Sequence, residues 1–421
     1  MKTIAIIGAG PAGIICSLYL AKRGIQSTLI DKSFFPRHKP CGDNIAGNVL
    51  RILNEIAPGF LDRLLKEKKI PEVKGFVAFA ANNHKMKIDF LPLEVGTDIP
   101  SCYTVSRKDL DNEMIKLAKS NPLIEVIEGY KVSSLERKKG GLLIKSHNQS
   151  IFCRLAIICN GSNGNIVKNI HTLVKEDAHF AVGIRAYYKN VKPFKFDQYS
   201  ELYIIKKLLP GGLYITPLTN GMVNVTVVVR KDVIKKNNLN LKQILLEELG
   251  EHPLLKDRFA AAELVGKIEG GGLLLGTQKR RISGDNFMLA GDAAGLIDLL
   301  SANGIPQAML NGRIAAEFAA KCVQENDFSS HALADYDSRV YDRVKNYLKM
   351  SKLVSPLLSY KIVIYIFLKA MNFIAKKYDK SDQIRDLLYD QKASEKLLKP
   401  SFYYKLFFGI KNPDASSKDP R

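Results

Sequence analysis

The spacing of apolar and polar residues at the start of the chain predicts a strand, a helix and a second strand. Thr3 to Gly8 is a short apolar run, Pro11 to Arg23 has helical spacing, and Ser27 to Asp31 is a second apolar run that ends in an acid. Apolar runs that alternate with helical segments are typical of α/β folds. We therefore expect the chain to open with an α/β unit.

The same patterns divide the rest of the chain. Helical spacing recurs at Asn44 to Ile56, Arg107 to Lys119 and Gly304 to Lys321, and strand-like runs occur at Val73 to Ala80, Met86 to Phe90 and Asn286 to Ala290. Alternating and β-branched residues from Val182 to Arg230 predict an antiparallel sheet. After about Asn326 the pattern is helical, basic and aromatic, and we expect the polar tail from Asn412 to be disordered.

Composition narrows the class of protein. The 421 residues are 46% apolar, enough for two domains with separate cores and an appendage. The six cysteines form no C-x-x-C pair and no cluster with histidines, so we expect neither a zinc site nor a disulfide framework. The chain enters its first strand without a basic and apolar leader, which favours the cytoplasm.

The net charge of +21 leaves two interpretations open. It can reflect solvated surface lysines, or it can mark an anionic partner. Nucleic acid is not the expected partner, because no recognition helix, RNP or zinc-finger pattern accompanies the charge. An anionic membrane surface fits better, and it would place the protein peripherally on the inner face of the membrane.

A glycine motif, GAGPAG, follows the first predicted strand and opens the first helix. Gly8 permits a tight turn, Gly10 lets the backbone approach a pyrophosphate, and Gly13 allows close packing of helix and strand. The helix start, which includes Ala12, points its positive end at the phosphates. Asp31 ends the second strand, where its carboxylate can accept hydrogen bonds from ribose. The motif predicts a dinucleotide site without choosing between FAD and NAD.

A second motif, far along the chain, favours FAD. The strand ending at Ala290 is followed by Gly291 and Asp292 and then by a turn into a helix. Asp292 would hold the ribityl and pyrophosphate region, and the helix start at Gly304 and Ile305 would present N–H groups to the pyrimidine edge of a flavin. An NAD-binding protein needs no such second binding site, so FAD is the predicted cofactor.

Four further stretches carry a family resemblance. They are Pro36 to Gly42 (PRHKPCG), Arg107 with Leu110 and Asp111, Ala181 to Val191 (AVGIRAYYKNV), and Pro210 to Val225, in which Ile215 and Thr216 depart from an aromatic pattern. In this order they resemble the P-x-x-K-x-C-G, R-x-x-[FL]-D and substrate-domain segments of the geranylgeranyl reductase family, within the para-hydroxybenzoate hydroxylase superfamily. The resemblance covers roughly residues 1–322.

The resemblance implies further FAD contacts and one candidate catalytic residue. The added contacts are Lys32, Cys41, Gly42, Arg107 and Val132. In the resembled family the signature cysteine lies beside the flavin ring, so the Cys41 thiol would donate a proton or tune the flavin; alternatively, Cys41 is a small buried residue that lets the chain turn. His38 and His179 stand alone and are expected to be structural.

Two segments depart from the resembled patterns. The family usually reads D-P-[FL]-x-G-E-G-I at the flavin turn, whereas Asp298 to Ile305 has Leu299 for the proline and Asn303 for the glutamate. Asn163 stands where the superfamily carries an aspartate linked to nicotinamide binding. We expect the changes at Leu299 and Asn303 to alter substrate handling or the flavin potential.

The C-terminal part combines apolar, basic and aromatic residues. Its longest apolar run, Ile362 to Leu368, is far shorter than the roughly 20 residues that a spanning helix needs. At helical spacing a narrow basic stripe borders a broad apolar face; the stripe is formed by Lys361, Tyr365, Lys369, Asn372 and Lys376. An aromatic cluster follows, formed by Phe402, Tyr403, Tyr404, Phe407 and Phe408. The pattern fits an interfacial helix, or a helix packed on the flavin domain.

We therefore expect an α/β protein with a Rossmann-like FAD-binding domain of the para-hydroxybenzoate hydroxylase type and an inserted antiparallel-sheet substrate domain. The FAD domain is assigned to residues 1–72, 101–165 and 276–325, the substrate domain to 73–100 and 166–275, and a basic helical region to 326–421. The resemblance implies reduction of C=C bonds in a prenyl lipid by hydride from reduced flavin. A monooxygenase of an apolar substrate and a lipid-binding flavoprotein with little turnover remain alternatives, and NAD(P)H and reduced ferredoxin both remain open as electron donors.

Overall fold

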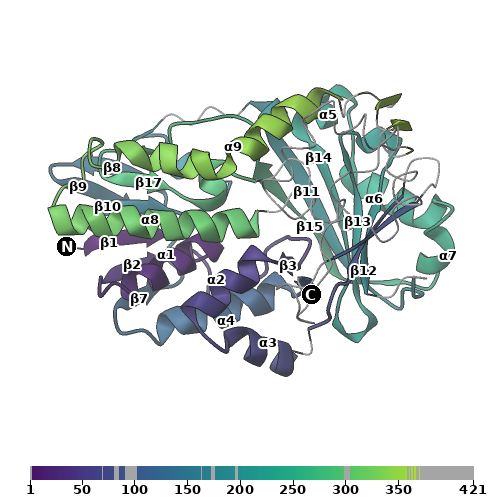
Figure 1. Ribbon diagram of the computed structural model, residues 1–421, viewed down its shortest axis with the longest axis horizontal. Helices are drawn as coiled ribbons and strands as arrows, with labels where there is room; N and C mark the ends of the chain where they lie inside the picture. The colour runs from purple at the N-terminus through teal and green to yellow at the C-terminus, as the bar shows by residue number, and fades with distance from the viewer. Residues whose placement is uncertain are drawn as a thin grey trace, which may run out of the picture.

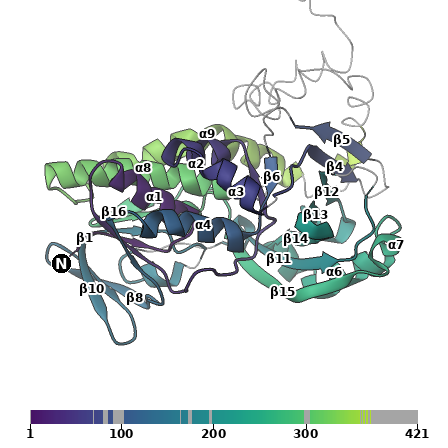
Figure 2. The same ribbon diagram turned by 90° about the horizontal axis from the view of Figure 1, so that it is seen from below.

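The computed structural model describes residues 2–68, 70–79, 85–90, 102–162, 164–171, 176–194, 198–297 and 304–357, together with residues 360, 362, 363, 365, 366 and 369. An α/β part that contains the N-terminus lies beside a second sheet (Figure 1). The short antiparallel pair of β3 (Asn44–Ala46) and β6 (Cys102–Thr104) lies between them (Figure 2).

The α/β part is built on parallel strands in the order β7-β2-β1-β10-β17. Their bounds are β1 (Lys2–Ile7), β2 (Ser27–Ile30), β7 (Ile124–Ile127), β10 (Ser150–Ile158) and β17 (Phe287–Leu289). Antiparallel strands extend the sheet: β16 (Ser283–Gly284) beside β17, and the hairpin of β8 (Ser134–Lys138) and β9 (Gly141–Lys145) beside β10. The strand order reverses direction between β1 and β10, and ligands bind outside the carboxyl ends of strands at such a point.

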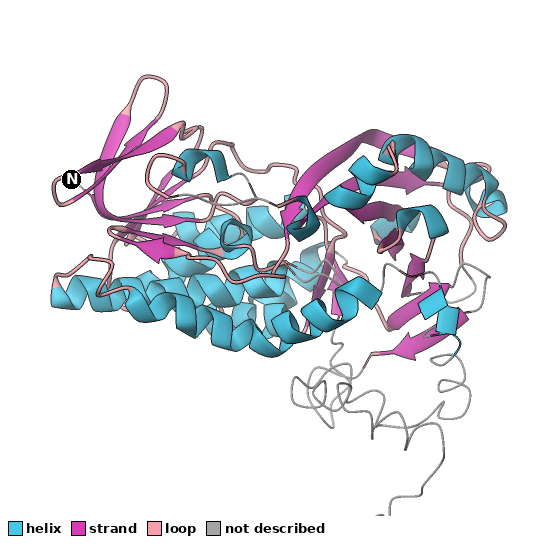
Figure 3. Ribbon diagram, turned by 90° about the horizontal axis from the view of Figure 1, so that it is seen from above, coloured by secondary structure: helices cyan, strands magenta, loops and turns pink. Residues whose placement is uncertain are grey.

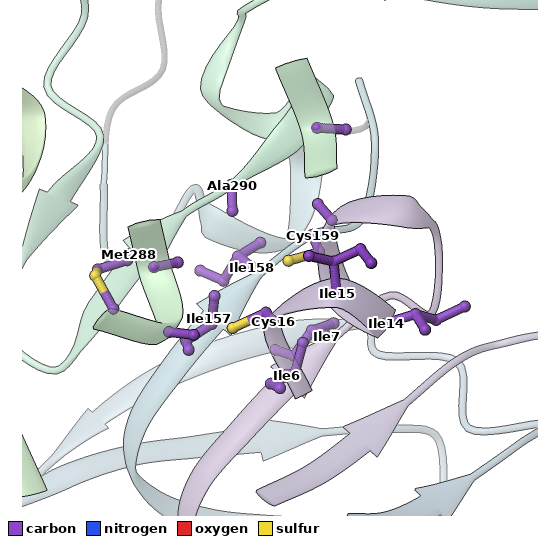
Figure 4. Packing of buried hydrophobic residues seen from close by; sticks show 14 of the residues in the cluster. Ile6, Ile7, Ile14, Ile15, Cys16, Ile157, Ile158, Cys159, Met288 and Ala290 are labelled. Carbon is purple, nitrogen blue, oxygen red and sulfur yellow. The ribbon is translucent and has the colours of Figure 1, made fainter. Parts of the chain in front are cut away.

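The helices of this part gather on one face of the sheet (Figure 3). They are α1 (Pro11–Ala21), α2 (Asn48–Ile56), α3 (Phe60–Lys68), α4 (Arg107–Lys119), α8 (Ile305–Glu325) and α9 (Ala334–Leu357). Figure 4 shows the contact between α1 and the sheet, where Ile15 and Cys16 pack over Ile7 and Ile158. These side chains are at most 4% exposed, as expected for strands covered by helices. The predicted α/β architecture is confirmed.

The second sheet has the order β15-β11-β14-β13-β12-β4-β5. Its strands are β4 (Gly75–Phe79), β5 (Lys85–Asp89), β11 (Phe180–Lys189), β12 (Tyr199–Tyr203), β13 (Gly211–Pro217), β14 (Val223–Arg230) and β15 (Glu263–Leu274). Its apolar face packs against α6 (Leu241–Glu251) and α7 (Lys256–Phe259), while α5 (Lys231–Lys236) follows β14. The antiparallel pairing predicted for residues 182–230 is confirmed by β11, β12, β13 and β14. The sheet as a whole is mixed, because β4 pairs with β12 in parallel.

Side-chain alternation on β14 gives the second sheet two different faces. Val225, Val227 and Val229 pack into its apolar core, whereas Asn224 and Thr226, at the alternate positions, point to the opposite face. The opposite face is the one that meets the α/β part, since Asn224 bonds the loop at residues 41–43. A polar side chain on alternate positions of this strand is therefore available to the site.

One further prediction was inexact. The helix expected from Asn44 begins only at Asn48, because Asn44–Ala46 pairs with β6. In the C-terminal region α9 ends at Leu357. Among the described residues no helix combines the length and apolarity needed to cross a membrane.

Candidate functional site

The three fingerprint glycines meet different surroundings at the carboxyl ends of β1 and β10. A Cβ on Gly8 would lie 2.4 Å from the Cys159 carbonyl oxygen, and one on Gly13 would lie 2.0 Å from that of Gly8. A Cβ on Gly10 would have Nη2 of Arg37 as its nearest neighbour, 3.9 Å away. Gly8 and Gly13 are thus required by packing, whereas Gly10 faces open space.

The N-terminus of α1 faces this open space. No side chain caps the helix at Gly10, and the first N–H groups of a helix have no partner within it. Ala12, in the first turn, is buried. The unpaired N–H groups and the helix dipole make this end of α1 suited to a phosphate.

Asp31 lies buried at the end of β2, beside the fingerprint loop. Its Oδ2 accepts a hydrogen bond from the Ala9 N–H (2.8 Å) and its Oδ1 accepts one from the Ser33 N–H (2.9 Å). Each carboxylate oxygen retains a lone pair for another donor. Lys32 is exposed next to it, and Val132 is half-buried two residues after Tyr130, whose N–H donates to the Asp31 carbonyl. Lys32 and Val132 therefore flank the end of β2.

The segment PRHKPCG (residues 36–42) contacts both the fingerprint and the Gly291-Asp292 turn. Arg37 lies 3.2 Å from Asp111 and donates to the carbonyl of Ala9 (3.4 Å). Lys39 Nζ lies 3.5 Å from Oδ2 of Asp292. This segment places one cation next to the fingerprint and a second next to the Gly-Asp turn.

Arg107 is buried at the start of α4 in a bidentate ion pair. Its Nε and Nη2 donate to the two oxygens of Asp111, at 2.7 and 2.6 Å. Burial disfavours the charged guanidinium, but the Asp111 carboxylate outweighs burial and raises the pKa of Arg107 above its usual value. Arg107, the predicted cofactor contact, is therefore paired with Asp111 and remains charged.

The second motif packs against the first. A Cβ on Gly291, which has a φ of 64°, would lie 2.9 Å from the Cβ of Ala12, and one on Gly304 would lie 3.1 Å from Oδ1 of Asp292. No side chain caps α8 at Gly304, and Ile305 is its first, buried residue. Asp292 thus stands at a second uncapped helix N-terminus. The predicted departures at Leu299, Asn303 and Asn163 lie outside the described residues.

Cys41 is half-buried in the loop before β3. Burial raises the pKa of its thiol, so the thiol is protonated at neutral pH. Its carbonyl accepts a hydrogen bond of 2.7 Å from the Asn224 side chain. A Cβ on Gly42 would have no neighbour within 4 Å, so there is open space beside the backbone at this point as well.

Asp43, which the sequence analysis did not single out, is fully buried behind Cys41. Oδ2 accepts hydrogen bonds from the Tyr187 hydroxyl (2.6 Å) and the Asn224 amide (2.7 Å), and Oδ1 accepts one from the Arg107 N–H (3.3 Å). Burial raises the pKa of Asp43 to about 6, although these donors oppose the shift. Its partners are 64 to 181 residues away in sequence, so no local motif reveals the cluster.

A pocket of about 200 Å³ lies where the second sheet meets the α/β part. Its lining combines the apolar residues Ile70, Val105, Leu218 and Met222 with Tyr187 and six polar residues; the polar residues are His38, Thr104, Ser106, Lys108, Asp109 and Thr219. The Val105 N–H donates to the Asp43 carbonyl, so the wall of the pocket directly covers Asp43.

These features fit FAD. Gly10 and Gly42 leave room along the backbone, two helix N-termini lack caps, and Arg37 and Lys39 supply positive charge between them. The matching family model, described as an FAD binding domain, covers residues 1–347. The chain belongs to this family. It is an FAD-dependent oxidoreductase by family.

Curated relatives of this flavoprotein include reductases. It is 26% identical to digeranylgeranylglycerophospholipid reductase of Thermoplasma volcanium over 83% of this chain and 87% of the relative. It is 24% identical to menaquinone reductase of Mycobacterium tuberculosis over 75% of each. It is also 27% identical to conditioned medium factor receptor 1 of Dictyostelium discoideum, over 79% of this chain and 66% of that protein's length.

Solved structures show the same fold. A geranylgeranyl bacteriochlorophyll reductase-like protein from Thermoplasma acidophilum superposes with a TM-score of 0.76 at 21% identity, covering 88% of this chain and 91% of that one. A halogenase variant in complex with FAD gives a TM-score of 0.70 at 16% identity, covering 93% and 84%. The resemblance to geranylgeranyl reductases and the FAD cofactor are confirmed, and the flavoprotein fold also carries halogenation.

Proposed function

We propose that this flavoprotein reduces carbon–carbon double bonds in the prenyl chain of a lipid. The observation that supports this best is the pocket: apolar walls beside the Cys41–Asp43 loop, at the junction of the two parts of the molecule. Two relatives carry the names of lipid reductases, one of them for a digeranylgeranyl lipid. Because fold does not fix chemistry, the pocket rather than the fold carries the proposal.

The size of the pocket suggests which part of a lipid enters. Its 200 Å³ is below the roughly 300–1,000 Å³ of pockets that enclose a whole ligand. Ile70, Val105, Leu218 and Met222 offer no hydrogen bonds from their side chains, so they suit a hydrocarbon segment. The pocket would hold the reacting part of a prenyl chain while the rest of the lipid stays outside.

The division of labour in this reaction follows from the residues present. Bound reduced FAD supplies the hydride. Asp31, Arg37 and Asp292 would hold the dinucleotide, the apolar walls would orient the chain, and a protein group must bring the proton to the second carbon. The sequence offers Cys41 for that group, and its thiol is protonated at neutral pH because burial raises its pKa. The structure adds a second candidate, Tyr187, which lines the pocket and bonds Asp43.

The proposal is tested by reduction under anaerobic conditions. The full chain with bound FAD is reduced with dithionite and mixed with digeranylgeranylglycerophospholipid in detergent micelles. We expect lipid-dependent reoxidation of the flavin and a gain of two hydrogen atoms per reduced bond by mass spectrometry. A gain of one oxygen atom, in air only, would show a monooxygenase instead. Neither change would show a lipid-binding flavoprotein without turnover.

The electron donor is tested in the same system. NADPH, NADH and reduced ferredoxin are each supplied to oxidised enzyme under anaerobic conditions, and bleaching of the flavin is followed. We propose that one of them reduces the flavin at a rate that exceeds lipid turnover. A donor that bleaches it more slowly than lipid turnover is excluded.

A lipid substrate also makes membrane association useful. The exposed side chains described beyond α9 are largely apolar or aromatic: Tyr360, Ile362, Tyr365 and Ile366. Lys369 stands above the Tyr365 ring, 4.8 Å from its centre. Lys361, Asn372, Lys376 and the aromatic cluster from Phe402 lie outside the described residues. We propose that this region docks on an anionic bilayer, where apolar contacts and lysines act together.

A further inference from the structure

Two strands of the second sheet bring hydrogen-bonding side chains to Asp43. On β11, Ala186 and Tyr188 point into the apolar core, so Tyr187 between them points to the opposite face. On β14, Asn224 points the same way. The Tyr187 hydroxyl and the Asn224 amide both reach Oδ2 of Asp43, at 2.6 and 2.7 Å.

The orientation of the Asn224 amide is fixed by a third residue. Thr226 Oγ1 donates to Oδ1 of Asn224 (2.8 Å), which leaves the amide nitrogen facing Cys41 and Asp43. The donor set around Asp43 is therefore built into the strand. It can stabilise a carboxylate without a formal ion pair.

The two arginines near Asp43 form ion pairs with other carboxylates. Arg107 pairs with Asp111, and Arg185 pairs with Glu269 (2.8 Å) while its guanidinium lies 3.9 Å from the centre of the Tyr187 ring. The titratable groups that face Asp43 are Cys41, Arg107, Arg185 and Tyr187. Among the described residues no cation forms an ion pair with Asp43, so its proton is retained more easily than that of a salt-bridged carboxyl.

The protonation state of Asp43 decides where the Tyr187 proton points. When Asp43 is ionised, the phenol donates to Oδ2. When Asp43 is protonated, its own O–H can donate to the phenol oxygen, and the phenol proton is then released from Asp43 and can turn toward the pocket that Tyr187 lines. Asp43 is fully buried and does not line the pocket, whereas Tyr187 does.

We propose that Tyr187 and Asp43 together form the proton source of the reduction, with Tyr187 as the donor and Asp43 as the group that reprotonates it. The inference rests on the proposed function. One alkene carbon receives hydride from reduced flavin, and the π electron pair forms the other C–H bond as the Tyr187 O–H bond breaks. The Asp43 O–H bond breaks at the same time, and its proton passes to the phenol oxygen.

The balance closes within the site. The alkene is reduced and the flavin oxidised, Tyr187 ends as a neutral phenol, and Asp43 ends as a carboxylate held by Asn224 and the Arg107 N–H. No phenolate forms, which matters because burial and the Asp43 charge raise the pKa of Tyr187 above its usual value. Between turnovers a solvent proton reaches Asp43 through Tyr187 by the reverse movement.

The test compares three variants of the full chain with bound FAD. Tyr187→Phe keeps the ring under Arg185 and removes only the hydroxyl; Asp43→Asn removes the carboxyl proton. Tyr188→Phe is the matched control, because Tyr188 points into the core of the second sheet. With digeranylgeranylglycerophospholipid as the probe, we expect Tyr187→Phe and Asp43→Asn to slow anaerobic lipid reduction by about 10²-fold or more at nearly unchanged KM. The control should keep the wild-type rate.

Two readouts separate a proton source from a structural role. The wild-type rate should fall as Asp43 ionises above pH 6 and should show a solvent deuterium isotope effect, and both features should vanish in Asp43→Asn. Infrared spectra between pH 4 and pH 8 should show a carboxyl band that is lost with a midpoint near 6, is absent in Asp43→Asn and is shifted in Tyr187→Phe. The infrared readout requires no lipid.

The outcomes distinguish this inference from the proposed function. If the carboxyl band behaves as expected but the wild type reduces no prenyl lipid, the proposed function fails and the Tyr187–Asp43 proton coupling stands. If lipid is reduced and Tyr187→Phe keeps both the rate and the isotope effect, the proton source is wrong and the proposed function stands. A carboxyl band that has the same position in wild type and in Tyr187→Phe would also contradict the assignment of Tyr187 and Asp43 as the proton source.

Discussion

Nη2 of Arg37 lies 3.9 Å from the point where a Cβ atom would stand on Gly10, and no other group is nearer to that point. The contact joins two stretches that the sequence shows only separately. It also leaves the space above Gly10 free, in contrast to the crowded surroundings of Gly13.

The first prediction uses that contrast. Gly10→Leu should fold with nearly unchanged thermal stability in the absence of FAD and lose the yellow colour, because the added side chain enters the pyrophosphate's approach path. Gly13→Leu should fail to fold, since its Cβ would lie 2.0 Å from the Gly8 carbonyl oxygen. Absorbance near the flavin maximum and circular dichroism check both results. Full FAD occupancy in folded Gly10→Leu would contradict the fingerprint assignment.

A second prediction concerns Cys41. Cys41→Ser keeps the size of the side chain and removes the thiol, so FAD should stay bound while the reductive or oxidative half-reaction slows. Stopped-flow absorbance measures both half-reactions. Cys102→Ser, at a buried thiol on β6, is the control. Wild-type rates in both half-reactions of Cys41→Ser would assign Cys41 a purely structural role.

A third prediction follows from the raised pKa of Asp43. The carboxyl has a pKa of about 6 in the folded chain, against 3.8 without the environment. Between these values the folded state binds more protons than the unfolded state, so the wild type loses stability as pH rises from 4 to 7. Asp43→Asn has no carboxyl at this position and therefore does not lose this stability. The free energy of unfolding of Asp43→Asn relative to wild type should therefore rise by on the order of 3 kcal/mol over this range.

Urea denaturation at pH 4, 5, 6 and 7 measures the difference between the two proteins. Asp285→Asn is a suitable control, because hydrogen bonds at Ser330 lower the pKa of Asp285 and the sign of its pH dependence is opposite. A constant difference between wild type and Asp43→Asn across the range would mean that Asp43 is already ionised at pH 4.

The pocket leads to a fourth prediction. Leu218→Glu places a charge among apolar walls and should raise KM for the prenyl lipid by about tenfold or more while FAD stays bound. Leu246→Glu, at an exposed site on α6, should change neither. Steady-state lipid reduction and flavin absorbance give the comparison. An equal effect of the two substitutions would remove the pocket from the substrate path.

The last prediction concerns the membrane. Reversing three lysines of the C-terminal stripe, Lys361→Glu, Lys369→Glu and Lys376→Glu, should weaken binding to anionic vesicles by at least about two orders of magnitude at low salt, since each lysine contributes about 1 kcal/mol. The matched control reverses the exposed lysines Lys22, Lys131 and Lys139. Co-sedimentation with phosphatidylserine vesicles measures both. If both sets weaken binding equally, the whole net charge acts rather than this region.

The sequence alone predicts the elements whose signal is local. GAGPAG, the Gly291-Asp292 turn and the period of the helices each lie within a few residues, and the structure has the helix 107–119 with the expected bounds. Asp43 was missed because its partners come from β11 and β14, and the polar face of a strand looks the same whether it meets solvent or a buried acid. The parallel pairing of β4 with β12 was missed for a related reason, since strand direction depends on chain connections rather than on alternation.

The contact between α1 and α8 has a consequence for how the protein acquires its cofactor during synthesis. A Cβ on Gly312 would lie 2.3 Å from the carbonyl oxygen of Ala12, so the two helices touch along their backbones. The residues expected to hold the dinucleotide therefore come from both ends of the first 312 residues of the chain. A nascent chain that has left the ribosome only as far as the second sheet holds half of the binding site. FAD capture must then wait until α8 has emerged and docked, and a ribosome stalled before that point should carry a colourless chain.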